Sequence, residues 1–157
     1  VHEENYVFHG EKDTLVTGSF LYASMKEVGG SDMLRIDRNL ALADMWGAMK
    51  ATHLPVAAIV DWSTLLVGIV TERDLIHKAL QYGEECLKWP VHKVMTENPH
   101  HMLLKHHLVY ALNNMAQFRY RNILIVDEDR FPILITELID FLKFFRHVLA
   151  QINFEVE

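Results

Sequence analysis

An internal repeat with an offset of 66 residues constrains the fold of this 157-residue chain more than any other feature. Residues 42–49 and 108–115 both carry apolar side chains at the i, i+3, i+4 and i+7 spacing of one helical face. The same offset relates 57–61 to 123–127, two short apolar runs that end in aspartate and are typical of buried strands. The chain therefore contains two copies of one structural unit.

Each copy continues with a turn, a second apolar strand and a second helix. The turn and strand span 61–70 in the first copy and 127–135 in the second. The Thr-Glu dipeptides at 71–72 and 136–137 follow at an offset of 65, which predicts a one-residue deletion in the second copy. The second helices are expected to bury Leu75, Ile76, Ala79 and Leu80 in the first copy and Leu138, Phe141, Leu142 and Phe145 in the second.

With a short leading strand near 33–36 or 101–103, each unit has the order β-α-β-β-α. Since neither unit buries enough apolar surface alone, we expect the two pseudo-symmetric repeats to pack through their sheets. The predicted class is α/β (α+β). The expected organisation is an N-terminal segment at 1–19, repeat 1 at 20–82, a linker with two prolines at 83–99, repeat 2 at 100–150 and a tail at 151–157.

Composition excludes some classes of function. The net charge of −6 with histidine neutral lacks the broad cationic face that nucleic-acid binding requires. No apolar run approaches the roughly 20 residues of a membrane-spanning helix. The single cysteine, Cys86, allows no internal disulfide and fits a cytoplasmic protein.

Four stretches then carry a family resemblance. They are Leu66–Leu75 (LVGIVTERDL), Val94–Pro99 (VMTENP), Ala111–Arg121 and Ile125–Asp129. Together they resemble the CBS-domain family, and the pair of repeats resembles a Bateman module. The resemblance covers about 20–147 and implies clefts between the sheets that bind AMP, ADP, ATP, S-adenosylmethionine or a related ligand. It also implies a regulatory role toward an attached effector domain or partner protein, and a homodimer formed through the helices.

The resemblance implies a nucleotide contact at Gly68, Thr71 and Asp74, which match the family's Gly-x-x-Thr/Ser-x-x-Asp motif. The chemistry fits, because an aspartate accepts hydrogen bonds from ribose hydroxyls and a threonine at a helix N-terminus meets phosphate. The glycine would let a ligand approach the backbone. Thr71 and Asp74 also have the spacing of a helix capping box, so a purely structural role stays open.

The second copy departs from this motif when it is aligned on its Thr-Glu dipeptide. Thr136 is kept, but Ile133 replaces the glycine and Ile139 replaces the aspartate. Asp140 lies one residue later, about 100° further round a helix, and is not expected to substitute. We therefore expect one competent ribose site and one degenerate site.

The remaining predicted contacts come from the resemblance. The adenine wall is expected at Met102 and Leu103, and Arg121 matches a phosphate-binding position. The first copy has Pro55 and Val56 at the equivalent places. The ribose motif and the basic residue are therefore expected at different sites, which argues against a triphosphate. The full predicted set is Gly68, Thr71, Asp74, Met102, Leu103, Arg121 and Thr136.

Two other kinds of site have little support. His100, His101, His106 and His107 lie close together in the sequence, but neighbouring residues of a strand face opposite ways and no zinc-binding motif accompanies them. No metal site is predicted. The chain also lacks a nucleophile elbow, a phosphate loop and a dinucleotide fingerprint, so no catalytic residue is predicted and we do not expect an enzyme.

The leading hypothesis is a regulatory module that senses an adenine nucleotide or related adenosyl ligand. The alternative is a structural homodimerisation module with vestigial sites and no physiological nucleotide. A metal-dependent protein or enzyme built on the histidines is a third hypothesis. The identity of the ligand and of any regulated partner stays open at this point.

Overall fold

The computed structural model describes residues 20–154, with side chains to residue 151. Its elements are η1 (Phe20–Tyr22), α2 (Met25–Val28), β1 (Leu34–Asp37), α3 (Leu42–Thr52), β2 (Val56–Val60), β3 (Leu66–Thr71), α4 (Glu72–Tyr82), η2 (Gly83–Lys88), η3 (Val91–Lys93), β4 (Thr96–Glu97), β5 (His101–Leu103), α5 (Leu108–Phe118), β6 (Asn122–Val126), β7 (Pro132–Glu137) and α6 (Leu138–Phe154). None of the helices in this part of the chain is long and apolar enough to cross a membrane.

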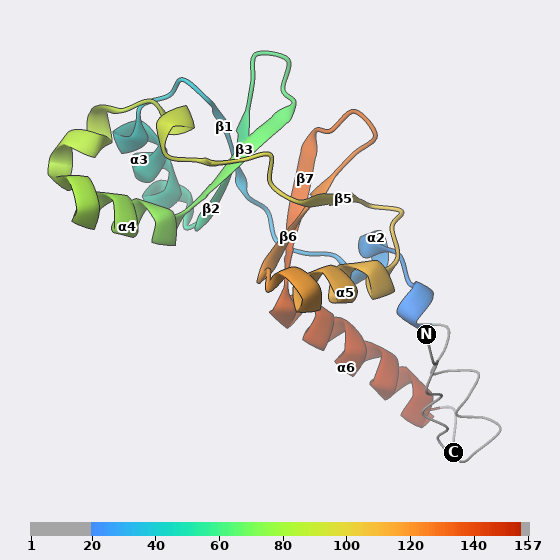
Figure 1. The fold of residues 1–157 in the computed structure, drawn as a ribbon. Helices are drawn as coiled ribbons and strands as arrows, with labels where there is room; N and C mark the ends of the chain where they lie inside the picture. The colour runs from blue at the N-terminus through green and yellow to red at the C-terminus, as the bar shows by residue number, and fades with distance from the viewer. Residues whose placement is uncertain (1–19, 155–157) are drawn as a thin grey trace.

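The two predicted repeats are confirmed, each with the order β-α-β-β-α. One sheet has the strand order β1-β2-β3-β4 and the other β5-β6-β7, with a parallel pair followed by an antiparallel hairpin in each. Figure 1 shows the two sheets side by side, with α3 and α4 beyond one and α5 and α6 beyond the other. The mixed α/β class and the packing through the sheets agree with the expectation.

The predicted one-residue deletion is wrong, because the offset stays at 66 through the second hairpin. Val56 pairs with Thr71, and 66 residues later Asn122 pairs with Glu137. The two hairpin turns also match: the backbone N–H of Asp61 donates to Leu65, four residues on, and Asp127 donates to a carbonyl at the same spacing. Position by position, the second copy of the motif is therefore Leu134, Glu137 and Asp140.

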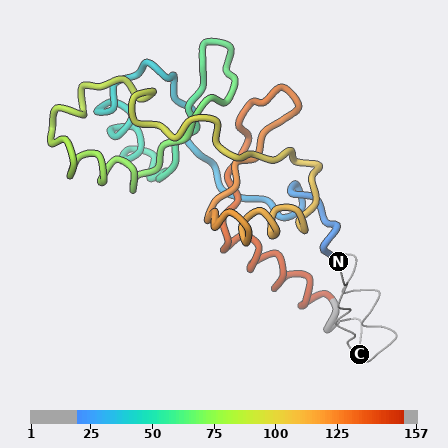
Figure 2. The backbone as a smooth tube through the Cα atoms, in the orientation of Figure 1, coloured from blue at the N-terminus to red at the C-terminus, as the bar shows by residue number. Residues whose placement is uncertain are grey.

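Each repeat is covered by the segment that precedes the other repeat. We call the segments before β1 and β5, at 20–28 and 83–99, the leaders of repeat 1 and repeat 2. The backbone N–H of Met25, in the first leader, donates to His106 of repeat 2 at 2.8 Å. At the matching position, Val91 donates to Leu40 of repeat 1 at 2.9 Å. Figure 2 shows the two leaders crossing between the lobes, one in blue and one in yellow. The predicted linker at 83–99 thus packs on repeat 1, as the segment at 20–28 packs on repeat 2.

Three apolar clusters hold the described chain together. One lies within each repeat, and the third lies between the two sheets, as the shared core was expected to do. The buried members of the third cluster are Met33, Val56, Ala58, Leu66, Leu124, Val126 and Ile135. Burial of these side chains from both repeats contributes apolar stabilisation to their association.

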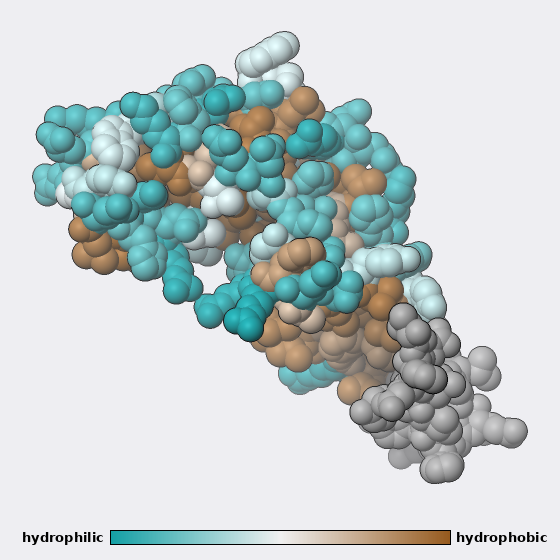
Figure 3. Space-filling view, viewed as in Figure 1, coloured by the Kyte–Doolittle hydropathy of each residue, from teal (hydrophilic) through white to brown (hydrophobic). Residues whose placement is uncertain are grey.

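The second helices bury a narrower face than predicted. Leu75 and Phe141 are buried, and Ala79 and Phe145 are half-buried, as expected. The prediction is wrong for four residues, whose exposed fractions are 54% for Ile76, 81% for Leu80, 57% for Leu138 and 54% for Leu142. The reason is that the core of one repeat covers only a narrow stripe of each helix. The apolar side chains outside that stripe stay on the surface, and Figure 3 shows such apolar surface, in brown, over the region of α5 and α6.

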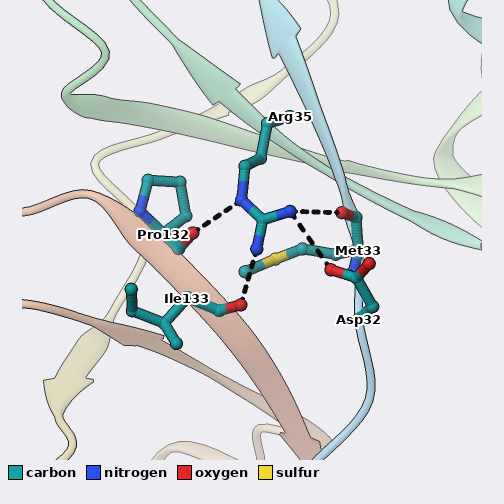
Figure 4. A network of polar contacts seen from close by, with 5 residues as sticks. All are labelled: Asp32, Met33, Arg35, Pro132 and Ile133. Carbon is teal, nitrogen blue, oxygen red and sulfur yellow. Dashed lines mark hydrogen bonds and ion pairs between the residues drawn. The ribbon is translucent and has the colours of Figure 1, made fainter.

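Two arginines join the repeats at the hairpin side of the sheets. The Arg35 guanidinium donates to the carbonyl oxygens of Pro132 at 2.8 Å and Ile133 at 2.6 Å, and Asp32 accepts a third bond at 3.1 Å (Figure 4). Arg130 makes a converse contact, from repeat 2 to the carbonyl oxygen of Leu66, at 3.3 Å. Charge-assisted bonds of this kind fix the relative position of two backbones.

Candidate functional site

The first motif forms a complete helix cap at the start of α4. Asp74 Oδ2 accepts from the backbone N–H and from the hydroxyl of Thr71, both at 2.8 Å, and the backbone N–H of Asp74 donates to Thr71 Oγ1 at 3.3 Å. The capping interpretation of this spacing is confirmed. Among the described residues, Asp74 Oδ1 has no hydrogen-bond partner, so one carboxylate oxygen remains free to accept a bond from a ligand.

A cleft pocket of about 350 Å³ lies between the edge of the first sheet and the start of β6. Its lining comes from both repeats: Ile69, Thr96, Glu97, Asn98, Pro99, His100, Tyr120, Arg121, Asn122 and Leu124. Ile69 packs against the cluster between the sheets. Alternate residues of a strand share a face, so Thr71, two residues after Ile69, lies on the same side of β3. The strand therefore leads from the wall of this pocket to Thr71 and Asp74, which are not themselves lining residues.

The separation of the ribose motif from the basic residue stays a prediction, because none of Gly68, Thr71 and Asp74 lines the pocket that Arg121 lines. Arg121 lines the same pocket as Ile69, because β4 pairs with β3 and draws the beginning of repeat 2 against repeat 1. No carboxylate among the described side chains lies within ion-pair distance of Arg121. The pocket thus combines a free cation with the strand that leads into Thr71 and Asp74.

Gly68 has a packing role on the other face of β3. A methyl group at this position would overlap Met95 Sδ and lie 3.1 Å from Met95 Cβ. The family resemblance implied that Gly68 leaves room for a ligand to approach the backbone. In the structure Met95 occupies this space, and the residue after Met95 begins β4.

We expect Gly68→Ala to lower the free energy of unfolding by about 1–3 kcal/mol, because the added methyl group must displace Met95. Urea denaturation followed by circular dichroism measures the loss. Met95→Ala removes the obstructing side chain, so the same glycine substitution in that background should cost much less. An equal loss in both backgrounds would show that Met95 is not the reason for the glycine.

Of the seven predicted contact residues only Arg121 lines the cleft pocket, and the three from repeat 2 that do not line it have other places. Met102 is buried in the core of repeat 2, while its neighbour Leu103 packs against the cluster between the sheets. Thr136 is fully buried, and its hydroxyl donates to the carbonyl oxygen of Gly29 at 2.8 Å. The structural counterpart of Thr71 is Glu137, so Thr136 has no place at the start of α6.

Asp140 is the counterpart of Asp74, which corrects the expectation that it is out of position. Its Oδ2 accepts from the backbone N–H of Glu137 at 2.9 Å, as Asp74 accepts from Thr71. Asp140 is only 7% exposed, and Lys143 Nζ lies 3.7 Å from its Oδ1. The second motif keeps the acid but carries leucine and glutamate in place of the glycine and threonine.

The cleft pocket has an aromatic rim that the sequence did not predict. The His100 ring stacks on Tyr120 at a centroid distance of 5.6 Å, and Tyr120 stacks on Phe118 at the same distance. Partial burial, with a smaller contribution from His101, holds the pKa of His100 below its usual value. The imidazole is therefore a neutral member of the rim near pH 7. Within the described chain, no group of three acidic, histidine or cysteine side chains is placed to hold a metal ion.

Asn98 and Asn122 are also unpredicted members of the lining. Asn98 has a positive φ of 46°, which is unusual outside glycine, and its backbone N–H donates to Val67 of β3 at 3.1 Å. The sequence offers one clue to both residues: Asn98 lies within, and Asn122 directly after, a segment that carries the family resemblance.

No family model matches the sequence, but the chain is similar to curated proteins that contain CBS domains. The chain is 28% identical over 124 residues to the CBS domain-containing protein CBSCBSPB5 of Arabidopsis thaliana, over 79% of this chain and 22% of that protein. A second Arabidopsis thaliana protein, CBSCBSPB2, is 29% identical over 104 residues, covering 66% of this chain and 19% of the relative. The chain thus spans about a fifth of the length of the curated relatives it matches.

Solved structures share the fold. A CBS-domain containing protein from Agrobacterium tumefaciens has a TM-score of 0.67 at 20% identity, over 89% of this chain and 98% of that one. A CBS domain protein from Pyrobaculum aerophilum, complexed with AMP, has a TM-score of 0.68 at 16% identity, over 82% and 96%. The CBS domain pair of protein MJ0100, in complex with 5′-methylthioadenosine and S-adenosyl-L-methionine, has a TM-score of 0.66 at 21% identity, over 79% and 96%.

Two copies of one β-α-β-β-α unit at a constant offset, exchanged leaders and a cleft lined by both copies agree with these relatives in sequence and in fold. The chain therefore has the fold of a tandem pair of CBS repeats, and its sequence is similar to that of CBS domain-containing proteins.

Proposed function

We propose that the cleft pocket binds an adenine nucleotide or a related adenosyl ligand, and that the chain acts as a regulatory module rather than as an enzyme. The observation that carries the proposal is the convergence of Arg121 and the strand leading to Thr71 and Asp74 on one pocket made by both repeats. The ribose hydroxyls would donate to Asp74 Oδ1, and Arg121 would meet a phosphate or carboxylate group. Relatives of this fold that are complexed with AMP or S-adenosyl-L-methionine support the ligand class.

A ligand in this pocket would touch both sheets. Ile69 belongs to the first sheet and Leu124 to the second, so a bound ligand favours the relative position of the repeats that fits it best. Such a bias becomes regulatory when an attached effector domain or a partner protein responds to it.

We also propose that the protein is cytoplasmic. The buried free thiol of Cys86 fits the reducing conditions of that compartment.

Calorimetric titration with AMP, ADP, ATP and S-adenosylmethionine tests the proposal. We expect at least one of the four to bind, and Asp74→Asn to weaken it about tenfold or more, because the amide gives up an anionic acceptor. The asparagine side chain keeps an oxygen that can accept the capping hydrogen bonds of α4, so the variant should weaken ligand binding without unfolding the helix. Asp140→Asn, at the matching position of repeat 2, is the control. Absence of binding by all four, or equal effects of the two variants, would contradict the proposal.

A second candidate function is a structural homodimerisation module with vestigial sites. Two observations favour it: Asp74 Oδ2 already accepts the bonds of the helix cap, and Met95 fills the space beside Gly68. In that case the chain would form a stable dimer and bind none of the four ligands.

We propose a homodimer in either case, formed through α4 and α6. Ile76 and Leu142 hold the same position in the two repeats, and both are about half exposed on helices whose other face is buried. Two equivalent apolar faces related by pseudo-symmetry suit a closed, two-fold assembly.

The double variant Ile76→Glu/Leu142→Glu should therefore sediment as a monomer where the wild type sediments as a dimer. Desolvating two carboxylates in an apolar interface is unfavourable, whereas the same residues on a free surface cost little. Lys88→Glu, an exposed change on η2, is the control. A monomeric wild type, or a dimeric double variant, would contradict this interface.

A further inference from the structure

A second pocket of about 350 Å³ lies on the outer edge of repeat 2, beside β5 and α5. It is lined by His100, His101, Met102, His106, Tyr110 and Asn114. His100 also lines the cleft pocket, so the two cavities share this residue. The function proposed above leaves this outer pocket unused.

Three polar residues of this lining are peculiar to repeat 2. At the offset of 66, the counterparts of His100, His106 and Asn114 are Leu34, Leu40 and Ala48. Leu34 and Leu40 pack against the core of repeat 1, as apolar side chains at these positions should. Repeat 2 replaces them with two imidazoles and an amide, a change that the packing of the fold does not require.

The hydrogen bonds around the pocket define which polar atoms remain available. The backbone N–H of Leu103 donates to His106 Nδ1 at 3.2 Å, so neutral His106 carries its proton on Nε2. Asn114 Nδ2 lies 2.8 Å from His100 Nε2, which leaves Asn114 Oδ1 as an acceptor. Within the described chain, neither His106 Nε2 nor Asn114 Oδ1 has a hydrogen-bond partner. The pocket therefore offers one N–H donor and one amide acceptor.

The rest of the lining suits a flat, uncharged group. No carboxylate, lysine or arginine belongs to it, and burial keeps the pKa of His100 low, which favours the neutral ring. Tyr110 is 60% exposed and offers an aromatic face to a bound ring. Aromatic and imidazole rings stack on nucleobases, and a base edge supplies the donor and acceptor that match the two free atoms.

We propose that this outer pocket binds an aminopurine base, at a site separate from the cleft between the repeats. The exocyclic amino group would donate to Asn114 Oδ1, and a ring nitrogen would accept from His106 Nε2–H. The ring would lie against Tyr110. An asparagine amide oxygen that accepts from the amino group of adenine is also one half of the bidentate contact used in nucleic-acid recognition.

Adenosine, which has no phosphate, is the probe. We expect calorimetry to find two adenosine sites in the wild type, of which Asp74→Asn weakens one about tenfold or more and leaves the other unchanged, because the outer pocket does not depend on Asp74. In the Asp74→Asn background, Asn114→Leu and Tyr110→Ser should each weaken the remaining binding about tenfold or more. Purine riboside, which lacks the amino group, should bind that background about tenfold more weakly than adenosine.

The outcomes separate this site from the cleft. Adenosine binding that survives Asp74→Asn and is lost in Asn114→Leu and Tyr110→Ser supports the outer pocket, even if the cleft binds nothing. Circular dichroism checks that each variant is folded, and Tyr110 is exposed enough that its change should not disturb the core. Failure of adenosine to bind Asp74→Asn, or indifference of that binding to both pocket variants, would overturn the proposal.

Discussion

Replacing Phe141 with alanine is expected to lower the free energy of unfolding by about 3–5 kcal/mol, the largest effect of any single change that we predict. The ring is fully buried in the apolar cluster of repeat 2, against which Met25 of the exchanged leader is also buried. Its removal leaves a cavity between two parts of the chain that are far apart in sequence. Urea denaturation followed by circular dichroism, at low protein concentration, measures the loss.

Leu142→Ala is the matched control, because Leu142 is the next residue of α6 but is 54% exposed. In the monomer its cost should stay within about 0.5 kcal/mol. A comparable loss at both positions would mean that α6 is rotated relative to the described structure.

Arg35→Ala should lower the free energy of unfolding by about 2–3 kcal/mol. The substitution removes two charge-assisted bonds across the repeats and leaves the carbonyl oxygens of Pro132 and Ile133 without their partner (Figure 4). The estimate is below the sum of two such bonds, because the Arg35 side chain is 31% exposed and water replaces part of the loss. Thermal and urea denaturation measure the change.

Two variants make the arginine test specific. Arg35→Lys keeps the charge but loses the forked geometry, so its cost should fall between those of the wild type and Arg35→Ala. Arg73→Ala, at an exposed position of α4, should be close to neutral. If Arg35→Ala were as mild as Arg73→Ala, the guanidinium would not be holding the repeats together.

The repeat and its elements could be predicted from the sequence, because helical and strand periodicities differ and both recur at a constant offset. The register of the second hairpin could not. Residues 131–135 alternate little between apolar and polar, so side-chain pattern does not distinguish adjacent registers. The repeated Thr-Glu dipeptide then suggested the wrong alignment, and Thr136 and Asp140 were misplaced with it.

The candidate site was predicted only in part for a related reason. Thr71, Asp74 and Arg121 were identified individually, but the pocket that Arg121 shares with Ile69 of β3 depends on the exchange of leaders that brings β4 to the edge of β3. No local sequence pattern predicts on which of the two repeats a leader packs. The exposed apolar residues Ile76 and Leu142 were likewise misjudged, since periodicity marks a helix face as apolar without saying what covers it.

The most direct test of the central claim is methyl NMR of the protein during titration with AMP and S-adenosylmethionine. Ile69 and Leu124 line the cleft pocket from the two sheets, while Ile76 and Leu80 are exposed on α4, on the outer side of repeat 1. We predict that the methyl signals of Ile69 and Leu124 shift with at least one ligand, and that those of Ile76 and Leu80 stay in place. Unmoved cleft methyls at saturating concentrations of both ligands would contradict the assignment of this cleft as the ligand site.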